Sequence, residues 1–192
     1  MNKLFIIALS LGVMILSSCR STSYTDPFDR PGSIVPVGSV LRLNQTLNFQ
    51  PGYSRSFIQF GKAVTFGQID ERDPYCQFER YEPPVALTSL RSVQPDEFIV
   101  IASSNWEEFV RAGSDISLMV SIGWKAMFDR DDLNLSLKMK LQSARQPEIV
   151  ALKCTVYAQP DYWNYLSVNQ VKATLGAIVT LKIAASAPVH QS

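Results

Sequence analysis

Three cysteines, one histidine and two acidic runs are the residues of this 192-residue chain whose chemistry could build a reactive site. A cysteine thiolate is a strong nucleophile and a metal ligand, but both uses require a nearby base or further ligands at short spacing. The single histidine, His190, lies in the small, polar segment 185–192, which we expect to be disordered. The sequence also lacks a G-x-S-x-G frame and a phosphate-binding loop. We therefore predict that the protein is not an enzyme and holds neither a metal nor a cofactor.

The two acidic runs, IDERDPY at 69–75 and FDRDDLN at 128–134, are the remaining candidates for chemistry. Paired carboxylates bind calcium or carry out acid–base catalysis. Neither run fits an EF-hand loop, because the second has Leu133 at a ligand position and no glycine after it. Asp, Pro and Asn are also the residues that turns require. We interpret both runs as solvated turns, and a hydrolase that uses two distant carboxylates is the least favoured alternative.

Cys19 follows a segment that has the pattern of a secretory signal peptide. Lys3 supplies a positive start, and residues 4–16 are apolar apart from Ser10. This run is too short to span a bilayer, which takes about 20 apolar residues, and small residues follow it. We therefore assign residues 1–18 to a signal peptide that is removed from the mature chain.

The sequence Leu16-Ser17-Ser18-Cys19 resembles the lipobox of bacterial lipoproteins. In that family the cysteine thiol receives a diacylglyceryl group, the peptide is cut before the cysteine, and the new amino group is acylated. The resemblance implies that Cys19 carries the lipid and holds the protein in a membrane. Arg20 stands where an aspartate retains enteric lipoproteins in the inner membrane, so the resemblance implies the inner leaflet of the outer membrane, facing the periplasm. The alternative is an ordinary signal peptide with an incidental cysteine.

The composition of the mature chain fits one neutral domain. Residues 19–192 hold 17 Lys and Arg against 17 Asp and Glu, which gives a net charge of zero once the amino group is acylated. A neutral chain without a basic run argues against nucleic acid as a partner. Residues 19–36, rich in Ser, Thr, Asp, Pro and Gly, are expected to form the lipidated cysteine and a flexible tether. Residues 37–184 are expected to form a single β-rich domain.

Alternation of apolar and polar residues predicts that this domain consists of strands. Four segments show the pattern, at 41–49, 118–128, 133–141 and 148–157. In the first, third and fourth segments the predicted core residues are Leu41, Leu43, Leu47, Phe49, Leu133, Leu135, Leu137, Met139, Leu141, Val150, Leu152, Cys154 and Val156. The second and third segments would form a hairpin through the turn DRDD. The last three segments have short connections and therefore predict an antiparallel meander.

One short helix is predicted near the C-terminus. Ser167 has the place of an N-cap, and Gln170 completes a capping box. An apolar stripe follows, and Gly176 stands at the C-cap before a final strand over 177–183. The segment 104–113 also has a capping pattern and a closing glycine, so it is a second candidate helix. These elements predict a mainly β fold, an antiparallel sandwich or barrel with one or two short helices.

Cys76 and Cys154 remain once Cys19 is assigned to the lipid. Both lie in predicted strands, in PYCQFE and ALKCTV, and both share a face with apolar neighbours. Two thiols exported to an oxidising compartment usually pair, so we predict a buried disulfide between strands. The alternative is a metal or redox site, which would need more ligands at short spacing or a C-x-x-C motif.

Five segments of the domain are distinctive: RSFIQFGKAV, DPYCQFE, PDEFIV, LQSARQPEIVALKC and LSVNQVKATLG. Together, from about Arg55 to Leu181, they resemble a group of small, functionally uncharacterised envelope lipoproteins of Gram-negative proteobacteria. The most specific features are the two cysteines in their strands and the Leu-Gly pair before the last strand. The resemblance implies class and cellular location, and no activity.

The aromatic run DYWNY places Tyr162, Trp163 and Tyr165 between the last long strand and the capped helix. Exposed aromatic side chains on a braced loop can anchor a protein partner or stack on a sugar ring. Covering the core beside the helix is the other use of such residues. We hypothesise that the protein is a membrane-anchored, non-catalytic interaction or accessory module of the envelope with a protein partner. A binding domain for a glycan, a peptidoglycan fragment or a small ligand is the alternative.

Overall fold

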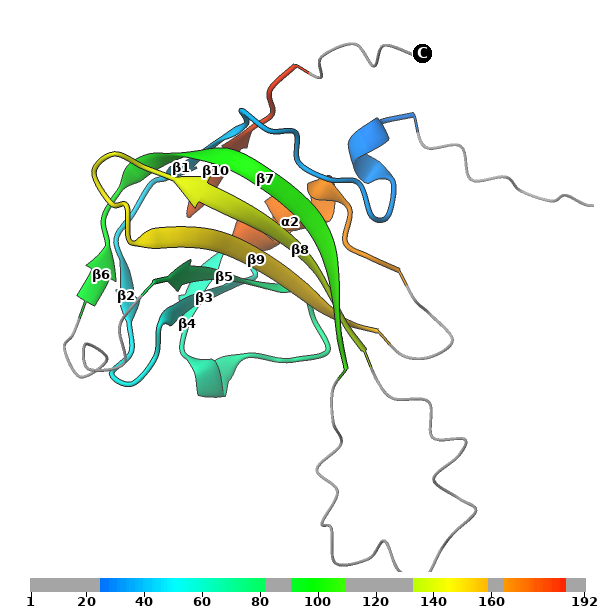
Figure 1. Ribbon diagram of the computed structural model, residues 1–192. Coiled ribbons are helices and arrows are strands. Elements are labelled where there is room, and N and C mark those ends of the chain that lie inside the picture. The colour runs from blue at the N-terminus through cyan, green and yellow to red at the C-terminus, as the bar shows by residue number, and fades with distance from the viewer. Residues whose placement is uncertain (1–24, 82–90, 110–132, 159–163, 186–192) are drawn as a thin grey trace, which may run out of the picture.

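Eight antiparallel strands, in the order β10-β1-β7-β8-β9-β5-β3-β4, form a sheet that curls into a half-barrel (Figure 1). β2 and β6 form a separate two-stranded sheet. The computed structural model describes residues 25–81, 91–109, 133–158 and 164–185. The elements are η1 (Pro27–Asp29), β1 (Val40–Leu43), β2 (Leu47–Phe49), β3 (Arg55–Gln59), β4 (Lys62–Val64), η2 (Phe66–Gln68), β5 (Tyr75–Arg80), β6 (Arg91–Val93), β7 (Asp96–Phe109), β8 (Leu133–Gln142), β9 (Ile149–Ala158), α2 (Val168–Leu175) and β10 (Val179–Lys182). The fold confirms the mainly β, antiparallel prediction, with one α-helix in the part of the chain that the structure describes.

The alternating apolar residues face the inside of the curl, where the core lies. In β8 all five predicted core side chains are buried: Leu133, Leu135, Leu137, Met139 and Leu141. The segment 41–49 forms two strands and not one, because the chain passes from β1 in the large sheet to β2 in the small sheet. Its four predicted core residues are nevertheless buried. In β9 the prediction is wrong for Val150, which is exposed because the pairing of β5 with β9 shifts register opposite it.

Helix α2 covers the inner side of the sheet and has the predicted caps. The Ser167 hydroxyl accepts a hydrogen bond from the Gln170 amide at 3.1 Å, and the Gln170 side chain accepts one from the Ser167 amide at 2.8 Å. The helix ends at Gly176, which has a φ of +55°. A Cβ on Gly176 would lie only 2.6 Å from the Cα of Gly61 in the β3–β4 turn. The end of the helix and this turn therefore touch backbone to backbone.

The second predicted helix, over 104–113, is wrong, because its residues up to Phe109 belong to strand β7. β7 pairs with β8 through ten residue pairs, from Ile99 opposite Gln142 to Phe109 opposite Leu133. This long ladder outweighs the local capping pattern, since tertiary pairing routinely overrides helix propensity. β8 therefore has β7 and β9 as its two neighbours, and the meander is β7-β8-β9. The predicted hairpin partner, 118–128, lies outside the described residues.

The chain segment before β1 packs on the domain from Asp26 onward, although the sequence predicts a flexible tether over 19–36. Val35 is 1% exposed and belongs to the core. Its amide donates a hydrogen bond to the Ser103 hydroxyl at 3.3 Å, and the Asn105 side-chain amide donates one to the Gly32 carbonyl at 2.8 Å. The polar inner side of β7 thus binds the entering chain, which explains why this Pro- and Gly-containing segment is ordered.

Candidate functional site

The outer face of the curled sheet carries polar and charged side chains, because the apolar residues of the same strands face the core. Cross-strand pairing aligns these side chains in rows. Glu79 of β5, Ala151 of β9 and Lys140 of β8 form one row. Lys153 of β9 and Lys138 of β8 lie opposite each other in the next row. Residues two apart on a strand point to the same face, so the rows follow one another regularly.

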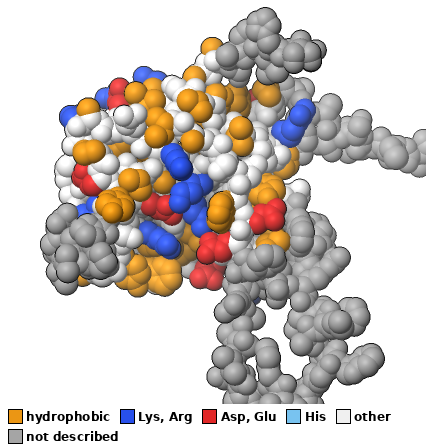
Figure 2. Space-filling model, in the orientation of Figure 1, with side chains coloured by type: hydrophobic (Ala, Val, Ile, Leu, Met, Phe, Trp, Pro, Cys, Tyr) orange, Lys and Arg blue, Asp and Glu red, His pale blue; other side chains and the backbone are white. Residues whose placement is uncertain are grey.

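A groove with a cavity volume of about 730 Å³ runs over this face, and we call it the outer groove. Its charged lining residues are Arg55, Arg80, Lys138, Lys140, Lys153, Glu79 and Glu108. These seven side chains give a net formal charge of +3. Figure 2 shows basic side chains gathered in the middle of the face, with acidic and hydrophobic side chains beside them. The outer groove is therefore a basic surface on a chain whose formal net charge is only +1.

Two ion pairs hold the acidic side chains of the outer groove. The Lys138 Nζ lies 2.7 Å from the Glu79 Oε2. The Lys153 Nζ lies 2.9 Å from the Glu108 Oε2. Burial raises the pKa of Glu79, but the hydrogen bonds from Lys138 and Gln77 outweigh it, so this pKa lies below its ordinary value. The hydrogen bond from Lys153 lowers the pKa of Glu108. Neither carboxylate has the raised pKa that a general acid needs at neutral pH.

Lys140 and Arg55 are the exposed cations of the outer groove, and neither forms an ion pair with another described residue. Arg80 has a different role, since it is 7% exposed and its guanidinium carbon lies 4.6 Å from the centre of the Phe49 ring. Lys140 and Arg55 lie in the same row of paired residues, with Glu79 and Ala151 between them. The outer groove thus offers two positive charges to an external anion.

Two aromatic side chains line the outer groove and are open to solvent. Trp106 of β7 is 58% exposed, and Tyr81, directly after β5, is 75% exposed. β8 and β9 lie between these two strands in the sheet. Large exposed aromatic side chains are typical anchors of binding surfaces. Sequence analysis missed Trp106 because it lies in the stretch that was predicted to be a helix.

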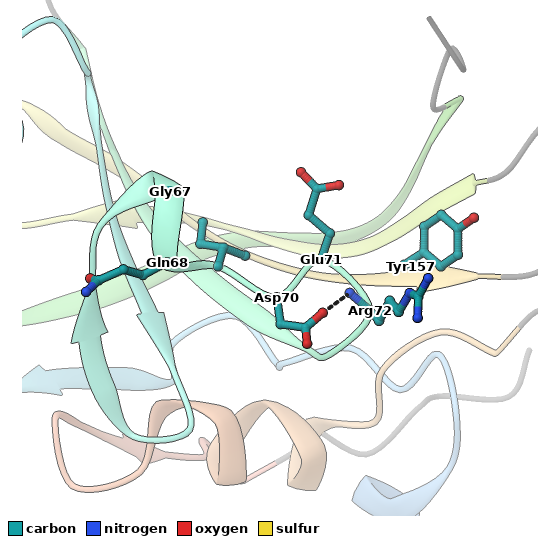
Figure 3. Close-up of a pocket in the computed structure, with 7 residues that line it drawn as sticks. Gly67, Gln68, Asp70, Glu71, Arg72 and Tyr157 are labelled. Carbon is teal, nitrogen blue, oxygen red and sulfur yellow. Dashed lines mark hydrogen bonds between the residues drawn. The ribbon is translucent and has the colours of Figure 1, made fainter.

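A second depression, with a cavity volume of about 640 Å³, lies between the loop 67–72 and Tyr157 of β9 (Figure 3). The Asp70 carboxylate accepts a hydrogen bond from the Arg72 amide at 3.1 Å. The Gln59 side chain holds the same loop, because it donates to the Asp70 carbonyl at 2.8 Å and accepts from the Asp70 amide at 3.0 Å. These bonds confirm that the first acidic run is a turn. Most of the second run lies outside the described residues.

Cys76 and Cys154 form the predicted disulfide. They lie directly opposite each other on β5 and β9, and both are fully buried. Their Cα atoms are 4.0 Å apart, so the bridge joins two strands that are already paired. It therefore belongs to the core and not to the surface. Cys19, the predicted lipid attachment site, lies outside the described residues.

Tyr165 is the member of the predicted aromatic surface that the structure describes, since Tyr162 and Trp163 lie outside the described residues. It is half-buried against a small apolar cluster that includes Leu135, and its hydroxyl donates a hydrogen bond to the Glu107 carboxylate. Burial and this contact raise the pKa of Tyr165 to about 12. Tyr165 thus covers the core, which is the alternative use of these aromatic residues. A surface role for Tyr162 and Trp163 stays a prediction.

Comparison with protein-family models, with curated proteins and with solved structures finds no match to this chain. In the described ranges, no helix has the length and apolar character needed to cross a bilayer. The same residues contain no group of three His, Cys, Asp or Glu side chains placed to hold a metal ion. A functional proposal therefore depends on the outer groove and on the sequence around Cys19.

Proposed function

We propose that this protein is a lipid-anchored envelope module that faces the periplasm and acts by binding a protein partner, without catalysis. In this proposal Cys19 carries the anchor, and the outer groove is the recognition surface. The observation that carries the proposal is the position of the groove relative to the N-terminal segment. The two lie on opposite sides of the curled sheet.

The N-terminal segment lies on the inner side of the sheet, beside α2. The Asn169 side-chain amide donates hydrogen bonds to Asp26 at 2.9 Å and to Asp29 at 2.8 Å. The Lys172 ammonium lies 5.7 Å from the centre of the Phe28 ring. Figure 1 shows α2 behind the ribbons of β7, β8 and β9, whose outer face is turned to the viewer. The described chain therefore begins on the side away from the outer groove.

The length of chain before this segment limits how the domain can sit at a membrane. Seven peptide units separate Cys19 from Asp26, and an extended chain of this length reaches at most about 25 Å. A lipid on Cys19 would thus keep the α2 side of the domain near the bilayer. The outer groove would face away from the membrane, where a periplasmic partner can reach it.

The electrostatics of the outer groove support binding over hydrolysis. A glycosidase needs one carboxyl group with a raised pKa to protonate the leaving group. Glu79 and Glu108 are the two carboxylates of the groove, and their pKa values are lowered. Both form ion pairs with lysines of the groove, so they fix the positions of these lysines on a basic surface.

Site-specific photo-crosslinking in intact cells tests the proposal. A benzophenone amino acid at Trp106 should give a defined protein adduct, whereas the same group at Ala173, an exposed residue of α2, should not. Cys19→Ala should abolish lipid attachment. The adduct at position 106 should then disappear, because the unanchored domain is no longer held near its partner. Adducts from position 173 and none from position 106 would place the interaction on the other side of the domain and overturn the proposal.

A further inference from the structure

We propose that the outer groove binds an extended acidic segment of the partner protein, with Trp106 and Tyr81 holding its two ends. This inference rests on the proposed function, because it names the partner chemistry of the same surface. The charge of the groove, the spacing of its cations and the separation of its aromatic side chains support it.

The charge of the outer groove selects an anion. Five basic and two acidic side chains line it, and both acidic side chains already pair with lysines of the groove. The exposed cations Lys140 and Arg55 have no ion pair with a described residue and are available to external carboxylates. Complementary charge across an interface speeds association and rejects partners of the wrong sign. A basic or neutral segment would leave these cations without a counter-charge.

The spacing of the cations matches an extended peptide. Lys140 and Arg55, the two cations without an ion pair to a described residue, stand at the ends of one row of paired residues that runs over β8, β9, β5 and β3. Three strand spacings, about 14 Å, therefore separate their backbones, which corresponds to about four residues of an extended peptide. A segment that crosses these strands obliquely, with Asp or Glu at every second position, therefore has carboxylates at the spacing of the two cations.

The two exposed aromatic side chains set the length of the segment. Trp106 pairs across the sheet with Ser136 of β8, which stands opposite Thr155 of β9, and this residue stands opposite Tyr75 of β5. Three strand spacings thus separate Trp106 from Tyr75, about 14 Å. Tyr81 lies six residues further along the chain, about 20 Å. The diagonal of about 24 Å corresponds to roughly seven extended residues.

Fluorescence anisotropy with the full chain, purified from membranes in a non-ionic detergent, tests this inference. The probe is a fluorescein-labelled eight-residue peptide with Glu at alternate positions. The matched controls are the same peptide with Lys in place of Glu, and labelled polygalacturonate as an acidic glycan. We expect the Glu peptide to bind, its affinity to fall at least tenfold between 50 and 300 mM NaCl, and the Lys peptide not to bind.

Variants of the outer groove make the test specific. Lys140→Glu and Arg55→Glu should each weaken binding at least fivefold, and Trp106→Ala should weaken it about tenfold. Lys182→Glu on the exposed edge strand β10 makes the same charge change away from the groove and should have no effect. Lys140→Ala should also weaken peptide binding while its melting temperature stays that of the wild type. Such a result would show that the affinity is lost through a missing contact and not through unfolding.

Two results would overturn the inference. Undiminished peptide binding by Lys140→Glu and Trp106→Ala would show that the outer groove is not the site. Tighter binding of polygalacturonate than of the peptide would assign the groove to an acidic glycan. Failure of the proposed function would give a different result. The peptide would still bind in vitro, but the crosslinker at position 106 would give no protein adduct in cells.

Discussion

Cys76 and Cys154 face each other across β5 and β9, and their disulfide is completely covered by the core. The bridge closes a loop of about 79 residues, for which the chain-entropy model gives on the order of 4 kcal/mol. We predict that Cys76→Ala or Cys154→Ala lowers the free energy of unfolding by about 2–5 kcal/mol, measured by urea denaturation. Dithiothreitol should lower the stability of the wild type by a similar amount and leave either variant unaffected. Alkylation of these thiols in the native, unreduced protein would contradict this assignment.

A buried carboxylate makes the fold sensitive to acid. Asp96, at the start of β7, accepts hydrogen bonds from the Ser143 hydroxyl at 2.6 Å and from the Gln146 amide at 3.2 Å, and it pairs with Arg145. Burial raises its pKa, but these hydrogen bonds outweigh burial and lower it from 3.8 to about 2. The ionised form is therefore favoured in the folded state. Ionised Asp96 therefore stabilises the folded state fully above about pH 4, and this stabilisation is lost as the pH falls through about 2.

We predict that protonation of Asp96 removes about 2 kcal/mol from the free energy of unfolding between pH 5 and pH 2. Asp96→Asn should lower stability at pH 7 and flatten the pH dependence over this interval, measured by urea denaturation at each pH. Its exposed neighbour serves as the control, since Glu97→Gln should stay within about 0.5 kcal/mol of the wild type at pH 7. If the free energy of unfolding of Asp96→Asn fell as steeply between pH 5 and pH 2 as that of the wild type, another group would be responsible for the acid sensitivity.

The β3–β4 turn contains a residue that is unfavourable at its position. Phe60 has a φ of +52° and precedes Gly61, whose φ is +68°, between the paired residues Gln59 and Lys62. Two-residue turns with positive φ at both positions favour Asn at the first. The Phe60 ring is 64% exposed, so removing it loses little burial. We predict that Phe60→Asn raises the free energy of unfolding by roughly 0.5–1 kcal/mol, since Asn tolerates this conformation.

The control for this turn is a similarly exposed phenylalanine whose φ is not positive. Phe66 in η2 is 49% exposed, and its ring centre lies 5.8 Å from that of Phe57. Phe66→Asn should therefore not stabilise the protein in the same urea experiment. A loss of stability in Phe60→Asn would show that the exposed ring makes contacts that outweigh the backbone strain.

The contact between α2 and the β3–β4 turn leaves no room for a side chain. We predict that Gly176→Ala lowers stability by more than about 2 kcal/mol, because it adds backbone strain at positive φ and its Cβ would lie 2.6 Å from the Gly61 Cα. The loss is measured as a drop in melting temperature. A Cβ on Gly67, by contrast, meets nothing within 4 Å. An equal drop for Gly176→Ala and Gly67→Ala would contradict the importance of the contact.

The parts of the fold that local sequence determines could be predicted. The caps at Ser167 and Gly176 act within one turn of α2, and the alternation in β8 needs only its own ten residues. β7 could not be identified in this way, because its capping pattern at 104–107 is local while the ladder that overrides it involves residues 133–142. Local signals therefore suffice for elements whose stabilising contacts are also local.

The outer groove could not be predicted for a related reason. Each strand contributes only one to three polar residues to it, and in the sequence these look like ordinary solvent-facing positions. Arg55 and Lys140 share a row because β3, β5, β9 and β8 are neighbours in the sheet. The disulfide was easier to predict, because export to an oxidising compartment was expected and the assignment of Cys19 to the lipid left one possible pair of cysteines.

The first strand of the domain has both of its partners far along the chain. Val40 of β1 stands opposite Ile99 of β7 on one side and opposite Lys182 of β10 on the other. The large sheet is therefore incomplete until nearly the whole polypeptide has been synthesised, and such distant pairings form slowly. A newly made chain stays without its finished fold during this time. In the proposed export to the periplasm, this delay would keep the chain unfolded while it crosses the inner membrane, and the sheet would close only afterwards.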